Sequence, residues 1–321
     1  MKSYIKIFAP EEGKKYSSFY IYLPAGEGHY VEYRFVYVKN PIDPTLGFAD
    51  GPNVPANCEL YRIREAYVGR LDGDVFTASF RALQSGEIGF ALREAGAGDF
   101  SGGFHGDEVL THVNLTLDGK NMPLYEPYFG SFEAFELDMD SNIFRCNTPS
   151  EKIILHRQKY TVDGNTLKLS QYIEWIADGK ILQSAYTPML TVQRIDPNDR
   201  MTVLTDTVEF YDKPDGTLIR TFDTTPYGAD AGGKYSDPVC ANTPSTAVRV
   251  YGKKSGFCAE CGYTVVDGTI PEDRIETNLD IRYKKALDNK IYFKIARDIA
   301  PKKGEIWQSE IYYRLTYAKN D

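Results

Sequence analysis

The chain has 321 residues, a formal net charge of −8 and a sequence pI of about 5.2. This length suffices for one large domain or for two smaller ones. The acidic balance argues against a nucleic-acid partner, because nucleic-acid-binding proteins normally carry a basic face. No run approaches the roughly 20 apolar residues of a membrane helix, so no membrane partner is expected.

The compartment stays open. Residues 1–22 show neither an apolar export signal nor a cleavage site. A cytoplasmic protein, a phage-borne protein and a secreted protein whose signal has been removed would all look like this, so the localisation is unknown.

Strand-like alternation of apolar and polar residues dominates the chain, and 24 Tyr and 17 Phe strengthen this signal. Hairpin turns are expected at 24–28, at Asp118-Gly119 and at 163–165. Strands are predicted at 16–23, 31–38, 60–67, 75–80, 87–93, 109–117, 129–139, 153–162, 166–175, 181–192, 201–211, 247–251, 262–266, 279–284, 291–295 and 306–317.

Helical periodicity is nearly absent. Long irregular loops are expected at 40–57 and 223–245, and one short helical turn at 271–275. Turn signals at short intervals predict an all-β fold, a large antiparallel β-sandwich of supersandwich-like form with very little helix. No composition break marks a linker, so residues 1–321 are predicted to form a single domain.

A glycine-rich stretch at 98–108 is the strongest candidate site. Its glycines permit positive φ and leave space above the backbone. His105 and Glu108 are predicted to point into the main pocket as a catalytic pair, because a histidine beside a carboxylate can act as a general base near neutral pH. Asp107 is a candidate substrate contact. The alternative interpretation is a simple turn whose histidine bonds to the backbone.

A second candidate cluster lies on the hairpin 153–175. Its predicted substrate contacts are Arg157, Tyr160, Tyr172 and Trp175, with aromatic rings for stacking on a sugar and charges for its hydroxyls. Adjacent residues of a strand point to opposite faces, so these side chains cannot all share one site. The alternative is that Trp175 is core and the charges solvate the sheet. Arg145 or Arg157 could neutralise the carboxylate of a uronic substrate.

Neither a metal nor a cofactor is predicted. Cys258 and Cys261 have the spacing of half a zinc site, but no second pair accompanies them, and they are interpreted as plain strand-edge thiols. Residues 138–142 resemble the start of a calcium loop without its glycine and glutamate, and are interpreted as a turn. Nucleotide-binding and serine-hydrolase fingerprints are missing from the sequence.

The sequence resembles the galactose-mutarotase-like β-supersandwich proteins in three places. These are residues 289–293 (NKIYF), residues 307–315 (WQSEIYYRL) and the long hairpin at 153–175. The resemblance covers mainly the C-terminal half and implies a carbohydrate-active sandwich, as in sugar epimerases and polysaccharide lyases. It implies two histidines and a carboxylate on facing strands, a setting that none of the four histidines matches. Residues 102–108 are also similar to segments of proteins from gut bacteria and their phages.

The sequence therefore predicts a carbohydrate-interacting β-sandwich that binds glycans or polysaccharides or acts on them in a lyase- or epimerase-like manner. Whether it is an enzyme is left open. The rival prediction is a non-catalytic structural or host-surface interaction protein of phage-tail or adhesion type. A homo-oligomer is possible under either prediction.

Overall fold

The computed structural model describes residues 1–39, 58–84, 88–199, 201–225, 240–267, 270, 274–281 and 287–318. The expected loop at 40–57 and most of the second, at 226–239, lie outside these ranges, as do residues 271–273 of the expected helical turn. The described residues contain no α-helix and one short 3-10 turn, η2 (Gly103–His105). The predicted all-β fold is confirmed.

The strands are β1 (Ser3–Ile7), β2 (Phe19–Gly26), β3 (His29–Lys39), β4 (Cys58–Asp72), β5 (Val75–Leu83), β6 (Ala91–Glu94), β7 (Glu108–Leu117), β8 (Lys120–Met122), β9 (Tyr128–Phe132), β10 (Phe135–Phe144), β11 (Lys152–Asp163), β12 (Thr166–Trp175), β13 (Leu182–Gln193), β14 (Thr207–Tyr211), β15 (Leu218–Asp223), β16 (Cys240–Thr243), β17 (Ala247–Tyr251), β18 (Phe257–Asp267), β19 (Glu276–Asp280), β20 (Asp288–Ala296) and β21 (Ile306–Tyr317).

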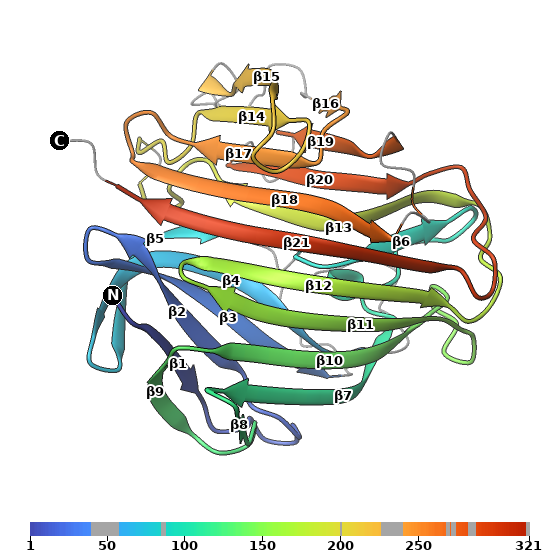
Figure 1. Cartoon of the computed structure of the whole chain (residues 1–321), viewed down its shortest axis with the longest axis horizontal. Helices are drawn as coiled ribbons and strands as arrows, with labels where there is room; N and C mark the ends of the chain where they lie inside the picture. The colour runs from blue at the N-terminus through green and yellow to red at the C-terminus, as the bar shows by residue number, and fades with distance from the viewer. Residues whose placement is uncertain are drawn as a thin grey trace.

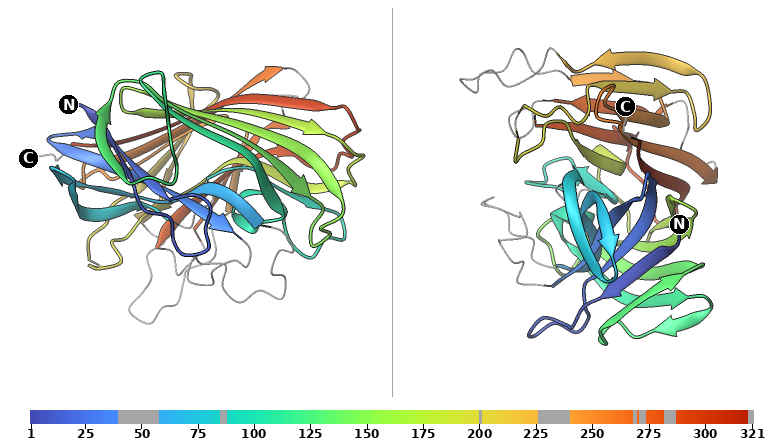
Figure 2. Two further views of the ribbon diagram at one scale, coloured as in Figure 1. Left: turned by 90° about the horizontal axis from the view of Figure 1, so that it is seen from below. Right: turned by 90° about the vertical axis from the view of Figure 1, so that its left-hand side faces the viewer.

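Two antiparallel layers build the molecule, and Figure 1 looks onto the first of them. Its hydrogen-bonded order is β8-β7-β10-β11-β12-β21-β18-β17-β14-β15. The second layer, seen edge-on in Figure 2, runs β9-β1-β2-β3-β4-β5-β13-β20-β19-β16. A short parallel pairing between β4 and β7 joins the layers at one end.

The core lies between the layers and follows from the alternation of the strands. In β3, Val31, Tyr33 and Phe35 face inward and are at most 1% exposed. The residues between them face away from the core. One continuous hydrophobic cluster holds residues from every part of the described chain, from Ile5 to Leu315. The assignment of the whole chain to a single domain stays a prediction.

Some strand boundaries differ from the sequence prediction. The run 129–139 is two strands, β9 and β10, because the chain turns at Glu133-Ala134, whose backbone N–H groups donate to the Asp118 carboxylate at 2.9 and 2.7 Å. The predicted strand 201–211 begins only at Thr207. The strands β1, β8, β15 and β16 were not predicted.

The strand assignments also bear on two interpretations made from the sequence, the turn at 138–142 and the thiols Cys258 and Cys261. Residues 138–142 were interpreted as a turn, which is wrong, because they form the middle of β10. Cys258 and Cys261 are three residues apart on β18, so they face opposite sides of the strand, and Cys261 is in the core. No helix in the described ranges is long and apolar enough to cross a membrane.

Candidate functional site

The glycine-rich loop is pressed against β6 and the residues before it. Ser101 and Leu92 exchange backbone hydrogen bonds of 2.9 and 2.8 Å. Gly102 and Gly103 have φ of 96° and 53°, and a Cβ at either position would lie 2.9 Å from the Phe90 carbonyl oxygen. Glycine is therefore required there on two counts, backbone conformation and space.

The predicted pairing of His105 with Glu108 in a pocket is wrong. His105 remains 21% exposed in its side chain, with Nδ1 3.5 Å from Asp99 Oδ1 and its ring 4.8 Å from that of Phe100. Glu108 turns the other way, into the sandwich, and is 1% exposed. The two side chains point to different sides because Glu108 is already the first residue of β7, paired with Ile143 of β10.

Glu108 instead forms a buried pair with His156 of β11. His156 Nδ1 lies 2.9 Å from Glu108 Oε1, and both residues are 1% exposed. Ser141 Oγ donates to the same oxygen at 2.5 Å, and the Gly103 backbone N–H donates to Oε2 at 2.6 Å. Burial raises the pKa of Glu108, but the histidine and these donors outweigh it, so the pKa lies below its usual value.

The Nε2 side of the His156 ring also faces polar side chains of the protein. Its Nε2 lies 3.4 Å from Gln171 Nε2, and Gln171 Oε1 accepts from Thr187 Oγ1 at 2.7 Å. Both oxygens of the Glu108 carboxylate are occupied, and His156 is enclosed in the core. This arrangement fixes the glycine-rich loop to the first layer, and it offers no reacting atom to a ligand.

Asp107 and Arg145 hold the same end of the sandwich together. Asp107 is 1% exposed, and its Oδ2 accepts from the Asn147 backbone N–H at 2.7 Å. Arg145 forms ion pairs with Glu94 and, at 2.6 Å, with Glu151. Its remaining nitrogen donates to the Asp178 carbonyl at 3.2 Å. Both residues, predicted as substrate contacts, are engaged with the protein itself.

The four predicted contacts on the hairpin separate into two pairs. Trp175 is fully buried, with its ring 5.4 Å from that of Trp307, and Tyr160 is 2% exposed, so neither ring presents a face for a sugar. Burial therefore contradicts the predicted sugar contacts at Trp175 and Tyr160. Tyr160 on β11 and Trp175 on β12 both belong to the core-facing residues of their strands, which alternate with outward-facing ones.

Arg157 and Tyr172 lie together on the outer face. They are direct partners across β11 and β12, with the guanidinium 5.0 Å from the ring centre. They line a shallow groove of about 240 Å³. Its other polar lining residues are Asp138, Asp140, Gln158, Lys159, Ser170, Gln171, Gln308, Ser309 and Glu310.

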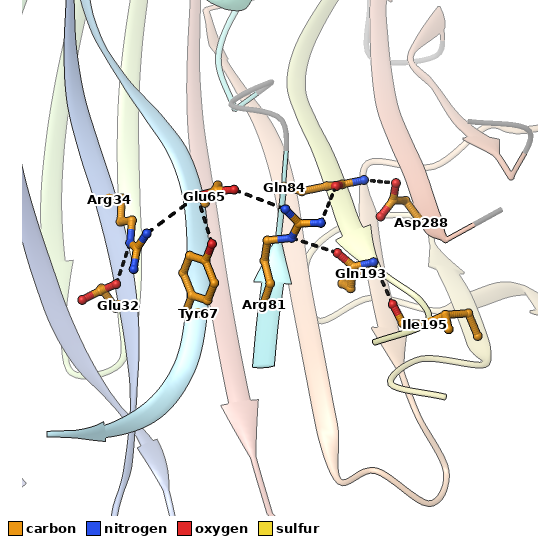
Figure 3. A network of polar contacts seen from close by, with 9 residues as sticks. All are labelled: Glu32, Arg34, Glu65, Tyr67, Arg81, Gln84, Gln193, Ile195 and Asp288. Atoms are coloured by element: carbon orange, nitrogen blue, oxygen red, sulfur yellow. Dashed lines mark hydrogen bonds and ion pairs between the residues drawn. The ribbon is translucent and has the colours of Figure 1, made fainter. Parts of the chain in front are cut away.

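A more extended polar array lies on the second layer, on the face turned away from the core (Figure 3). We call it the polar network, and it consists of Glu32, Arg34, Glu65, Tyr67, Arg81, Gln84, Gln193 and Asp288. These residues come from β3, β4, β5, the residue after β5, β13 and β20. The network therefore crosses five neighbouring strands of one sheet.

Arg34 occupies one end of the polar network. Its Nε is 2.6 Å from Glu32 Oε1, and its Nη1 is 3.8 Å from Glu65 Oε2. The guanidinium lies over two tyrosine rings, 4.1 Å from the centre of Tyr67 and 5.0 Å from that of Tyr20. Burial lowers the pKa of Arg34, but the charge of Glu32 and the bond to it prevail, so the pKa is raised.

Arg81 is the centre of the polar network. Its Nη1 contacts Glu65 Oε1 at 3.3 Å, and its Nη2 and Nε donate to the amide oxygens of Gln84 and Gln193 at 2.9 and 3.1 Å. Gln84 in turn contacts Asp288. Arg81 and Arg34 keep 25% and 27% of their side chains exposed. The network is thus held in place and still reaches solvent.

Two bulges in β4 and β5 create this alignment. The pairing of β3 with β4 passes from Arg34 opposite Glu65 to Phe35 opposite Ile63, and that of β4 with β5 from Ala66 opposite Leu83 to Tyr67 opposite Arg81. Each shift inserts an extra residue and re-aims the side chains that follow. Register shifts of this kind cannot be read from a strand's sequence, so the network was missed.

No protein-family model matches this sequence, and no curated protein matches it. Solved structures do. A galactose mutarotase-like protein from Clostridium acetobutylicum has a TM-score of 0.46 at 8% identity, with 98% of this chain and 99% of that chain covered. A protein from Escherichia coli K12 described as a candidate aldose 1-epimerase has a TM-score of 0.41 at 10% identity, covering 94% and 100%.

A galactose mutarotase related enzyme from Lactobacillus acidophilus has a TM-score of 0.36 at 12% identity, covering 80% of this chain and 96% of that chain. Two of these three descriptions name galactose mutarotase, which the C-terminal residues also resemble. All three TM-scores lie below 0.5 and no identity exceeds 12%, so no conclusion about activity is drawn from these structures.

Proposed function

We propose that this protein binds a saccharide on the outer face of the second layer, with the polar network as the binding surface. The observation that carries this proposal is Arg81, a partly exposed guanidinium that a carboxylate and two amide oxygens hold on three sides. A sugar offers hydroxyls that both donate and accept, and sites for it need a few polar groups fixed in position.

The surroundings support the same ligand class. Tyr20 and Tyr67 supply ring surface beside Arg34, and Glu65, 15% exposed in its side chain, supplies an acceptor. The groups lie on paired strands, which hold them more rigidly than loops would. Burial and the neighbouring Glu65 raise the pKa of Tyr67, so its hydroxyl stays a donor at neutral pH.

Binding is tested with a panel of neutral and uronic mono- and oligosaccharides, by calorimetry and on glycan arrays. Arg81→Met removes the central donors, and Tyr67→Phe removes one hydroxyl with little change of shape. The loss of one hydrogen bond from the charged Arg81 is worth about 1.5–3 kcal/mol, roughly a 10- to 150-fold weaker affinity. The loss of one from the neutral Tyr67 hydroxyl is worth about 0.5–1.5 kcal/mol, roughly a 2- to 10-fold weaker affinity. Melting curves check that both variants remain folded.

Arg157→Gln is the matched variant on the opposite layer, because Arg157 and Tyr172 are the alternative place for a sugar. We expect it to leave the affinity unchanged. If Arg157→Gln weakens saccharide binding and the variants of the polar network do not, the binding site is the groove of Arg157 and Tyr172. If the unmodified protein binds no glycan in the panel, the rival function as a structural or host-surface interaction protein takes its place.

An epimerase-like reaction is the second candidate, favoured by one contact. Tyr67 donates to Glu65 Oε2 at 3.1 Å, so a potential acid and a potential base stand together. Nuclear magnetic resonance exchange between the two anomers of a bound aldose tests it. Loss of catalysis in Tyr67→Phe at a saturating concentration of the aldose would support the reaction, and anomer exchange at the uncatalysed rate in the unmodified protein would reject it.

A further inference from the structure

A cavity of about 370 Å³ opens where β20 ends and β21 begins. It is far from the centre of the polar network, because Lys294 on its wall is six residues along β20 from Asp288, roughly 20 Å at the rise of a strand. Its lining residues are Ile270, Arg274, Glu276, Lys294, Ile295, Ala296, Arg297, Asp298, Ile299 and Trp307.

The inner wall of this cavity is apolar. Ile295 and Trp307 are 2% and 1% exposed, and Ile270 and Ala296 are buried beside them. Ile299 is half-buried and packs against the core. Small-molecule sites are mostly lined by such side chains, with a few polar groups that fix the orientation of the ligand. The apolar wall therefore fits a hydrocarbon chain or ring.

The described rim of the cavity carries one more positive than negative charge. Lys294 pairs with Glu276 at 3.2 Å, and Arg297 pairs with Asp298 at 3.1 Å. These two pairs cancel in charge. Arg274 is exposed on the same rim, and no carboxylate in the described ranges forms an ion pair with it. The described lining thus carries three cations against two carboxylates, a surplus of one positive charge.

We propose that this cavity binds a small amphipathic carboxylate, an organic acid with a short alkyl chain or an aromatic ring. The chain lies against Ile295, Ile299 and Trp307, and the carboxylate meets Arg274 at the rim. Arginine suits this role because its planar fork matches a carboxylate with two parallel hydrogen bonds. The proposal is independent of saccharide binding.

Tryptophan fluorescence provides the readout. The chain has two tryptophans, Trp175 and Trp307, and only Trp307 lines the cavity. Titration with octanoate should give a saturable change in emission, and calorimetry should give the same midpoint. Octanol and octylamine have the same chain without the negative charge and should bind at least about tenfold more weakly, the equivalent of one lost charge-assisted hydrogen bond.

Variants locate the site. Arg274→Gln should weaken octanoate binding at least about fivefold and leave octanol binding unchanged, and Ile299→Glu should abolish octanoate binding by filling the cavity with a like charge. Arg220→Gln, an exposed arginine on β15, is the matched control and should change nothing. Three results would each overturn the proposal. They are equal affinity for octanoate and octanol, the absence of saturation in both fluorescence and calorimetry, and an unchanged affinity for octanoate in Arg274→Gln.

Discussion

At the scale of single residues, the buried pair of Glu108 and His156 contributes to stability. Removing one partner leaves the other uncompensated in the core, which typically costs about 3–5 kcal/mol. We therefore expect Glu108→Ala and His156→Ala each to lower the free energy of unfolding by about that amount, as measured by chemical denaturation. Glu133→Ala, at an exposed glutamate, is the control and should change it by less than about 0.5 kcal/mol. Losses below about 1 kcal/mol in both pair variants would refute this role.

The same carboxylate makes a prediction about pH. The pKa of Glu108 is lowered in the folded protein, so its contribution to stability is complete above the unfolded value of about 4.3 and is lost as the pH falls through the folded value. The difference in unfolding free energy between the unmodified protein and Glu108→Gln should therefore be constant near neutral pH and shrink below about pH 4. A difference that instead grows on acidification would contradict the direction of the shift.

Residue-level reasoning from the sequence singled out the glycine-rich loop and predicted the wrong direction for the Glu108 side chain, which is buried against His156. Gly102 and Gly103 have the positive φ that the sequence analysis expected glycine to permit, and the structure adds that they lie against the Phe90 carbonyl. The direction of Glu108 was not predictable, because it depends on the register of β7 against β10. Tyr160 was predicted as a sugar contact, because nothing local shows that the face of β11 that it shares with His156 is the buried one.

At the scale of elements, the long hairpin and the last strand were predicted almost residue by residue, because β11, β12 and β21 alternate throughout and end at clear turns. The strand β15 was missed, since nearly all of its residues are exposed and it shows no alternation of burial. The bulges that align the polar network also have no local signature. Partner strands decide these features, so a single strand's sequence cannot reveal them.

The corner between β9 and β10 gives a prediction at this scale. Asp118, at φ 49°, accepts two backbone hydrogen bonds there. Asp118→Gly keeps the backbone conformation accessible and removes the acceptor, so the amides of Glu133 and Ala134 should exchange with solvent faster. Asp215→Gly, at an aspartate with φ 53°, is the control. Unchanged exchange at both amides would show that the carboxylate does not hold this corner.

At the scale of the whole molecule, the described chain is two antiparallel layers around one hydrophobic cluster, with strands running side by side in both layers (Figures 1 and 2). Far-ultraviolet circular dichroism should accordingly show a β-type spectrum, with less than about a tenth of the residues in α-helix against the usual third. Strong helical minima would contradict the fold. A homo-oligomer stays a prediction.

The exposure of the polar network distinguishes two possible functions of this molecule, a structural role and saccharide binding. A purely structural protein would use the polar network only to hold five strands in register. A saccharide-binding protein needs the network to be both pre-organised and accessible, which the partial exposure of Arg34 and Arg81 provides.

The most direct test is a crystal structure with the saccharide that binds most tightly in the glycan panel. Sugar hydroxyls within hydrogen-bond distance of Arg81 and Glu65 are the predicted result. A sugar seated instead in the groove of Arg157 and Tyr172, or elsewhere with the polar network unchanged and unoccupied, would contradict the proposed site.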